Sequence, residues 1–221
     1  MAGGFVAGNV LRVWKGAALS MEKIRDPHSP LGLDAYCIRR EKHPSGKILL
    51  ATDAAGQPAL YTRGPAFAET GPLLLFGDEA RQRPLLGLSF PRDLGEKWGV
   101  EISLPATGAR LGQAVWEKGR KGHRHMSLLS PQGELLLEVV RGGGILGGGR
   151  LFFDRRGRQA ARLTKAGLAG RGWRLSLAPH ATVTWRPLVM AASFLHVILR
   201  RLPPAQLAWR RTARTPGSSN K

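Results

Sequence analysis

Short apolar runs alternate with turn residues along most of this sequence. The segment KILLATDAAGQPALYT, residues 47–62, predicts a strand, a turn over Asp53–Gly56 and a second strand. The same layout recurs in later segments about every 25 residues, a spacing typical of successive hairpins. The pattern therefore predicts six antiparallel hairpins. In the last of them, GWRLSLAPHATVTWR, the closing strand is expected to contain Val183 and Trp185.

Strict alternation within the runs predicts a sheet with one buried face. Trp173, Leu175 and Leu177 fall on one side of a strand, while Arg174 and Ser176 fall on the other. Successive strand residues point to opposite faces, so the apolar set is expected in the core and the polar set in water. Outward positions are often arginine, which places part of the positive charge on the outer face of the sheet.

Six hairpins supply about twelve strands, and Tyr36–Lys42 adds one more or replaces a weak member. A meander of this size tends to close into a barrel, because closure removes the exposed edges. Twelve strands about 4.8 Å apart, tilted by about 40°, give a diameter of about 24 Å and a lumen of about 14 Å inside the side chains. An α-helix is about 10–12 Å across, so such a barrel has room for one helix.

The most apolar run of the chain provides that helix. Leu188–Leu199 contains only Ser193 and His196 as polar residues. The run is shorter than the roughly 20 residues of a membrane span, and it has no polar face with which to lie on lipid. The sequence therefore predicts a mainly β fold, a closed antiparallel barrel of about twelve strands around a central hydrophobic C-terminal α-helix over residues 187–201. The residues expected in the structural core of that helix are Leu188, Met190, Phe194, Leu195 and Ile198.

Three hairpin segments share their turn chemistry or their layout. ATDAAGQPALYTRGPAF and LFFDRRGRQAARLTKAG each place Asp-x-x-Gly between two strands, and GPLLLFGDEARQRPLLGL has a similar layout. With a helix-threaded barrel, these segments resemble the tubby C-terminal-like superfamily over residues 36–203, and are most similar to its LURP-one-related and phospholipid scramblase-like branch. The resemblance implies a twelve-stranded barrel around a buried helix.

The resemblance also carries functional expectations. Tubby proteins are associated with phosphoinositide headgroups through basic residues on the barrel wall, and scramblases with lipid movement and calcium. Cys37 is the only cysteine, so the lipidated cysteine cluster of scramblases has no counterpart here. The sequence also lacks a D-x-[DN]-x-[DN]-G loop for calcium. The resemblance therefore favours peripheral lipid binding over lipid scrambling.

The sequence divides into three parts. Residues 1–34 are expected to form an N-terminal extension, residues 35–204 the barrel with its helix, and residues 205–221 a basic tail with a composition typical of disorder. The extension has no secretory pattern. It predicts a short basic amphipathic helix, a frayed terminus or an added edge strand, with an organellar transit peptide as a further alternative. The apolar side of that helix would comprise Phe5, Val6, Val10, Val13 and Trp14.

Net charge narrows the class of partner without selecting one. The 221 residues hold 34 Lys and Arg against 15 Asp and Glu, a formal net charge of +19. Such a protein attracts anionic phospholipid, nucleic acid or an acidic protein, although the same charge can serve solubility alone. We expect a peripheral contact with anionic phospholipid in the cytoplasm, since the single cysteine suits a reducing compartment. The residues expected to bind the anion are Lys118, Arg120, Lys121, Arg124, Arg155, Arg156, Arg158 and Arg162.

Motifs for catalysis, cofactors and metals are weak. GGGILG at Gly142–Gly147 matches a dinucleotide-binding pattern, but a strand and a turn are predicted after it instead of a helix. A connection between hairpins is therefore expected there. His123 and His125 lack the further ligands that a metal needs, and His196 is expected as a hydrogen-bonded core residue. The serines lack a nucleophile-elbow motif, so the sequence predicts a non-enzymatic protein without a cofactor or a metal.

Overall fold

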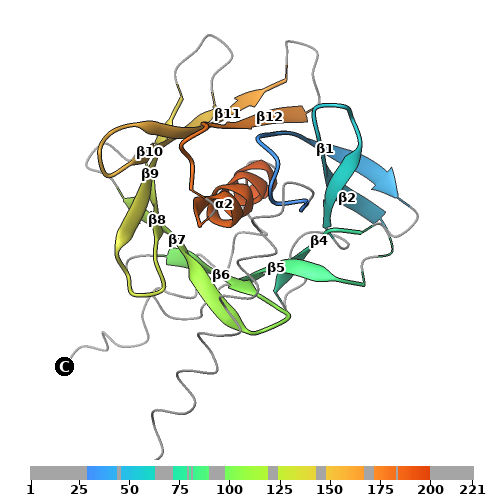
Figure 1. Ribbon diagram of the computed structural model, residues 1–221, viewed down its shortest axis with the longest axis horizontal. Helices are drawn as coiled ribbons and strands as arrows, with labels where there is room; N and C mark the ends of the chain where they lie inside the picture. Colours follow the sequence, from blue (N-terminus) through green and yellow to red (C-terminus); the bar gives the residue numbers. More distant parts are fainter. Residues whose placement is uncertain are drawn as a thin grey trace, which may run out of the picture.

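The computed structural model describes twelve strands and one helix (Figure 1). It describes residues 29–43, 46–62, 72–78, 80, 82–89, 98–118, 124–142, 148–166, 172–182 and 184–199. The strands are β1 (Ala35–His43), β2 (Gly46–Thr52), β3 (Pro58–Thr62), β4 (Leu73–Phe76), β5 (Pro84–Ser89), β6 (Trp98–Leu104), β7 (Ala109–Lys118), β8 (Arg124–Leu129), β9 (Leu135–Arg141), β10 (Arg150–Asp154), β11 (Gln159–Lys165) and β12 (Gly172–Leu177), and the helix is α2 (Trp185–Leu199). The predicted mainly β class is confirmed.

The strands form one closed antiparallel barrel. Each strand pairs with the next one in the sequence, and the circle closes where residues 35–39 of β1 pair with residues 172–176 of β12. Every described strand therefore has a neighbour on both sides, which removes the unpaired edges that an open sheet would present. The closed barrel predicted from the hairpin pattern is confirmed. Residues 1–28 and 205–221, expected as an extension and a tail, lie outside the described residues.

One predicted strand is wrong. The alternation that placed Val183 and Trp185 in a closing strand is too short to distinguish a period of 2 from a period of 3.6. Trp185 is instead the first residue of α2, and its N–H donates to the Thr182 carbonyl at 3.0 Å. Strand β1 fills the place in the barrel that this closing strand would have taken. The expectation that Tyr36–Lys42 could replace a weak strand is therefore the correct one. The helix begins two residues before the predicted start at 187, and residues 200 and 201 lie outside the described ranges.

One arrangement of hydrogen bonds shapes three of the hairpin turns. Between β10 and β11, the Asp154 N–H donates to the Arg158 carbonyl at 2.9 Å, and the Arg158 N–H donates to Asp154 Oδ1 at 2.9 Å. Gly157 has a φ of 73° in this turn, a left-handed conformation that is open to glycine. The turns at Asp53–Gln57 and Ser130–Glu134 repeat the arrangement, each with a glycine at positive φ. The Asp-x-x-Gly signal therefore marks hairpin turns, and Ser130 takes the place of the aspartate in one of them.

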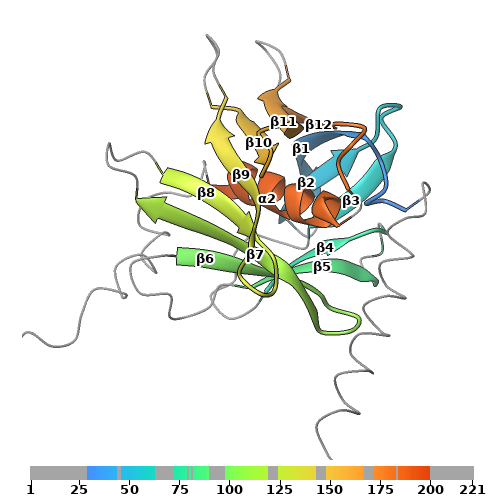
Figure 2. The same ribbon diagram turned by 60° about the vertical axis from the view of Figure 1, so that its left-hand side comes forward.

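Helix α2 runs through the inside of the barrel (Figure 2). Inward side chains of the strands and the helix form one apolar core. Ser193, a polar residue in this core, donates its hydroxyl to the Val189 carbonyl at 2.7 Å, so burial leaves no unsatisfied hydroxyl. The five predicted core residues are all buried, which confirms the position of the helix: Leu188, Met190, Phe194, Leu195 and Ile198.

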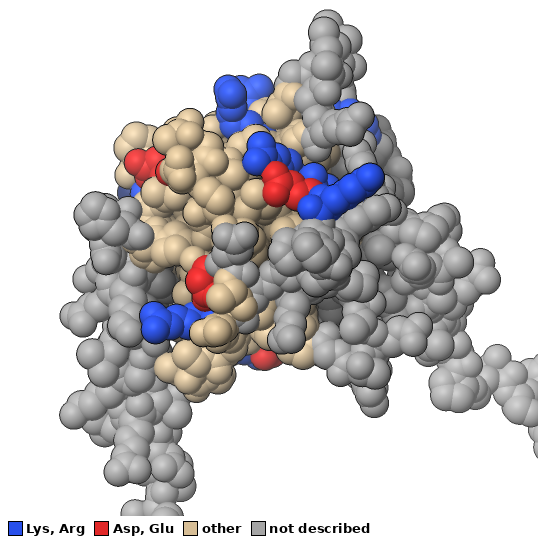
Figure 3. Space-filling view, turned by 90° about the vertical axis from the view of Figure 1, so that its right-hand side faces the viewer, with Lys and Arg blue, Asp and Glu red and all other residues tan. Residues whose placement is uncertain are grey.

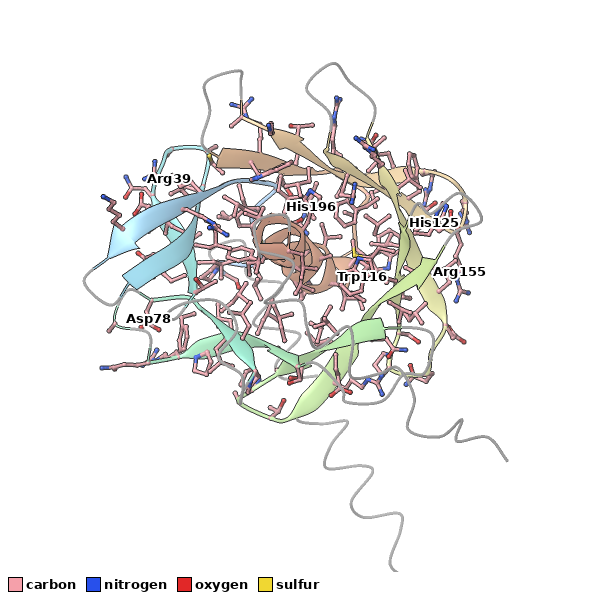
Figure 4. The ribbon with its side chains drawn as sticks, turned by 180° about the vertical axis from the view of Figure 1, so that it is seen from behind. Arg39, Asp78, Trp116, His125, Arg155 and His196 are labelled. Carbon is pink, nitrogen blue, oxygen red and sulfur yellow. The ribbon has the colours of Figure 1, made fainter. Side chains whose placement is uncertain are left out.

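His196 is the second polar residue of the helix interior. Its Nε2 lies 2.9 Å from the Gly148 carbonyl oxygen, which can only accept, so Nε2 carries a proton and donates it. The ring also packs edge-on against Trp173, with the ring centroids 5.1 Å apart. Figure 4 shows His196 inside the barrel. The prediction of a hydrogen-bonded core histidine is confirmed.

The outer face of β2, β3 and β4 carries a second apolar cluster. Leu50 lies opposite Tyr61, and Tyr61 lies opposite Phe76, so the three form a row across the strands. Their sequence neighbours Leu49 and Leu60 point the other way, into the main core. The row is widened along the strands by two further residues. We call the whole cluster the apolar wall: Ile48, Leu50, Tyr61, Leu74 and Phe76.

Residues 29–34 lie at the end of the barrel where α2 begins. The Arg186 guanidinium donates to the carbonyl groups of Gly32 and Leu33, and it pairs with Asp34 at 2.6 Å. Tyr36, the first buried residue of β1, donates its hydroxyl to the Pro30 carbonyl at 2.9 Å. Burial raises the pKa of the Tyr36 hydroxyl, so it remains a donor. These contacts hold residues 29–34 against the first turn of α2.

Candidate functional site

Arg158, one of the predicted anion-binding residues, is bound within its own turn. Its Nε and Nη2 both lie 2.8 Å from Asp154 Oδ2. Burial of the Asp154 carboxylate opposes its ionisation, but hydrogen bonds from the backbone and side chain of Arg158 and from the Arg156 N–H outweigh this effect. Together with the Arg158 charge, they hold the pKa of Asp154 below its usual value. Arg158 therefore stabilises the hairpin, and its charge is already paired with a buried carboxylate.

The other three arginines of this predicted group have different surroundings. Arg155 lies 3.4 Å from Glu134 and also donates to the Leu135 carbonyl. The Arg155 and Glu134 side chains are 56% and 66% exposed, so water weakens the pair. Arg156 at the turn and Arg162 on β11 are exposed, and neither side chain has an acidic partner among the described residues. Two of the four predicted arginines are therefore available cations.

The first predicted group lies at the end of the β7–β8 hairpin. Lys118 and Arg124 are directly opposite each other in the register of β7 and β8. The structure thus brings their backbones together, as the sequence spacing implied. Their side chains, and the whole of Arg120 and Lys121, lie outside the described residues. The proposal that these four residues bind an anion stays a prediction.

Arg162 belongs to a group on the outer face of β11 and β12. It lies opposite Ser176, and Thr164 lies opposite Arg174. Directly opposed residues on one face are about 4.5–5.5 Å apart at Cβ, and diagonal neighbours are about 7–8 Å apart. The two guanidinium groups therefore occupy one diagonal of a four-residue square and the two hydroxyl groups the other. We call this group the basic wall: Arg162, Thr164, Arg174 and Ser176.

The arginines of the basic wall differ from Arg39, Arg110 and Arg158, which each pair with an acidic side chain. Within the described part of the chain, no Asp or Glu forms an ion pair with Arg162 or Arg174, and both are exposed. Guanidinium groups flanked by hydroxyls present several N–H and O–H donors, which suits phosphate oxygens. Alternation in the sequence had placed Arg174 and Ser176 outward. Their proximity to Arg162 follows from the strand register, which sequence reasoning did not supply.

Elsewhere on the barrel, basic and acidic side chains are mixed. On the face shown in Figure 3, Lys and Arg lie beside Asp and Glu, and Arg39 of β1 pairs with Glu41 at 2.8 Å. Arg110 of β7 pairs with Glu101 at 3.2 Å. Figure 4 shows Arg39 and Arg155 on opposite sides of the barrel. Positive charge is thus spread around the barrel. The basic wall is distinguished by two unpaired arginines that share one face with two hydroxyl groups.

The remaining candidate motifs have structural explanations. The glycine-rich segment is followed by strand β10, and the Gly142 N–H donates to the Gly149 carbonyl at 3.0 Å, which confirms a connection between hairpins. Residues 143–147 and His123 lie outside the described ranges, and His125 is exposed on β8. The residues that the structure describes include no group of three His, Cys, Asp or Glu able to hold a metal ion. Of the described helices, none is long and apolar enough to cross a membrane.

Comparisons with known proteins add a likeness in fold. No family model matches the sequence, and no curated protein matches it. A solved X-ray structure of a protein from Arabidopsis thaliana is similar to the chain with a TM-score of 0.45 and 12% sequence identity, covering 75% of this chain and 90% of that chain. The closed barrel itself is established by the strand pairing of this chain, and the candidate site by its own residues.

Proposed function

We propose that this protein is a tubby C-terminal-like barrel of the LURP-one-related and scramblase-like kind, which docks on anionic phospholipid surfaces and catalyses no reaction. The unpaired Arg162 and Arg174 of the basic wall carry the proposal. Their guanidinium groups share one face with the hydroxyls of Thr164 and Ser176. Each cation held near an anionic membrane contributes about 1 kcal/mol of binding free energy. The pair therefore adds about 2 kcal/mol to the long-range attraction from the net charge.

Apolar residues beside the basic wall favour lipid over other anionic partners. Leu151 lies opposite Arg162 on the outer face of β10, and Phe153 follows it on the same face. Both are half-buried, so part of each side chain is accessible at the surface. A surface with basic and apolar groups side by side suits the boundary between headgroups and acyl chains. Nucleic acid and acidic proteins also supply anionic groups, but they offer no hydrocarbon layer for Leu151 and Phe153 to contact.

A vesicle-binding experiment with a matched control tests the proposal. The double variant Arg162→Ala with Arg174→Ala is compared with Arg39→Ala with Arg110→Ala, which removes the same charge from paired arginines. Sedimentation uses phosphatidylcholine vesicles with and without phosphatidylserine. We expect the basic-wall variant to bind the anionic vesicles roughly 30-fold more weakly, the equivalent of about 2 kcal/mol. The control variant should keep most of its affinity.

Two results would contradict the proposal. Equal losses in both double variants would mean that binding follows net charge and not the basic wall. Binding to duplex DNA or RNA with a steep salt dependence, without binding to anionic vesicles, would favour the nucleic-acid alternative. Added salt should release the protein from anionic vesicles, because the Debye length falls to about 3 Å at 1 M salt.

A further inference from the structure

The two ends of the barrel differ in their charged residues. Helix α2 begins at the end where Arg186 contacts residues 32–34, and it ends where His196 contacts Gly148. At the first end, arginines meet acidic side chains in three ion pairs: Arg186–Asp34, Arg155–Glu134 and Arg158–Asp154. At the second end, several strands finish in a cation.

Five described cations lie at the end of the barrel where α2 ends. In the alternation of its strand, each falls on the inward side beyond the last buried residues, as Arg141 does two positions after Val139 and Lys165 two positions after Leu163. They belong to β1, β9, β10 and β11, which together with β12 are consecutive around the barrel. We call this arc the basic rim: Arg40, Lys42, Arg141, Arg150 and Lys165.

The cations of the basic rim are close together and accessible. Arg141 lies directly opposite Arg150, which donates to the Gly149 carbonyl at 3.2 Å. Like charges in directly opposed positions of a sheet cost stability, so folding does not account for this pair. Lys42, Arg141 and Lys165 are exposed, and within the described part of the chain no Asp or Glu forms an ion pair with any of them.

We propose that the barrel docks end-on on anionic phospholipid, with the basic rim against the headgroups and the C-terminal end of α2 directed at the membrane. This inference rests on the proposed function and adds an orientation to it. Five adjacent strands about 4.8 Å apart spread the rim over about 19 Å, which fits an extended anionic surface and is too wide for a single phosphate group. Cations gathered at one end also turn that end toward an anionic surface before contact.

The basic wall adjoins the rim and joins it in this orientation. Arg174 of the wall lies two residues, about 7 Å, from the start of β12 at Gly172. On β10, the half-buried side chain of Leu151 directly follows Arg150. A barrel tilted toward β10–β12 therefore brings rim cations, Arg174 and an apolar side chain to the same lipid surface. A nucleic-acid duplex would engage the cations but leave Leu151 without an apolar partner.

Matched neutralisations at the two ends of the barrel test the orientation. Arg141→Gln with Lys165→Gln removes two rim cations. Arg83→Gln with Arg110→Gln removes two from the other end, where β5 and β7 begin. We expect the rim variant to bind vesicles of phosphatidylcholine and phosphatidylserine roughly tenfold more weakly, and the control to stay within about twofold of the unchanged chain.

Urea unfolding of both variants separates docking from a structural role. Cations near the last turn of a helix stabilise its dipole, so the rim could serve α2 alone. A loss of stability in the rim variant without a loss of vesicle binding would establish that role and overturn the proposal. Equal losses of binding in the rim and control variants would also overturn it.

A fluorescence measurement reads the orientation directly and separates it from the proposed function. In a Cys37→Ser background, a fluorophore is attached at Ala166→Cys, beside the rim, or at Gln132→Cys, in the β8–β9 turn at the other end. Nitroxide headgroups in the same anionic vesicles should quench the first label at least threefold more strongly.

Each other outcome has a defined meaning. Binding with equal quenching of both labels would overturn the end-on orientation and leave the proposed function in place. Absence of binding to anionic vesicles would refute both. Binding to duplex DNA in place of vesicles, with a loss in the rim variant, would assign the rim to nucleic acid.

Discussion

The apolar wall and the basic wall lie on the outside of the same barrel but have opposite surroundings. Both are built over inward leucines that are fully buried, such as Leu60 under the first and Leu175 under the second. They differ only in the residues at alternate positions, with Tyr61 almost completely buried in one and Arg174 exposed in the other. The inward side chains of each strand form the core of the barrel. The outward side chains can therefore vary and determine which partner the surface contacts.

A charge placed in each wall gives the largest expected contrast. Phe76 is 2% exposed, so Phe76→Glu places a carboxylate in a buried position, and an uncompensated buried charge costs about 3–5 kcal/mol. Arg174→Glu changes an exposed position, where substitutions usually stay within about 0.5 kcal/mol. Urea unfolding of the two variants measures the difference in free energy of unfolding. A small effect at both positions would show that the apolar wall is open to solvent.

The two walls also differ in how well sequence predicts them. Alternation in the last strand placed Arg174 and Ser176 outward, but their position beside Arg162 depends on the β11–β12 register. That register is set by pairing across the barrel and by the intervening connection, neither of which is visible in local periodicity. The continuous runs ILLA at 48–51 and LLLF at 73–76 carried a signal for the apolar wall, since a strand buried on both faces shows no alternation.

The barrel was predicted more completely than either wall, because its signals are local. Turn residues such as Asp53 and Asp154 form the hydrogen bonds that their type and spacing imply. The run from Leu188 is apolar on all sides and lies in the one place that buries every side. Trp185 was misplaced because two or three alternating residues fit a strand and a helix equally well.

The Asp154–Arg158 pair sharpens the comparison, because Arg158 is paired with a carboxylate whereas the arginines of the basic wall are not. The folded pKa of Asp154 lies below its unfolded value, so the pair's contribution to stability is present above the unfolded pKa. It is lost as pH falls through the folded pKa. We expect Asp154→Asn to lower the free energy of unfolding at neutral pH and to flatten its decline below about pH 4. Urea unfolding across this pH range is the measurement.

The same variant has an expected effect on binding. The asparagine side chain retains an oxygen that accepts from the Arg158 backbone N–H, so the turn should persist. The Arg158 guanidinium loses its carboxylate partner and is released. Asp53→Asn, in the equivalent turn without an arginine partner, is the matched control. Vesicle affinity should rise by a few-fold in Asp154→Asn, given about 1 kcal/mol at most per added cation. A rise of the same size in the control would trace the effect to net charge, because both variants remove one carboxylate.

The smallest expected effect separates a shaped phosphate site from two point charges. Thr164→Val removes a hydroxyl between Arg162 and Arg174 and should weaken anionic-vesicle binding about threefold, near the lower limit for one hydrogen bond. Ser103→Ala removes a hydroxyl that lies opposite Arg110, an arginine paired with Glu101, and should leave binding unchanged. If Thr164→Val also leaves binding unchanged, the hydroxyls serve only as spacers. Replacing both basic-wall arginines with lysine would then preserve affinity, whereas a site that depends on the planar guanidinium fork would lose it.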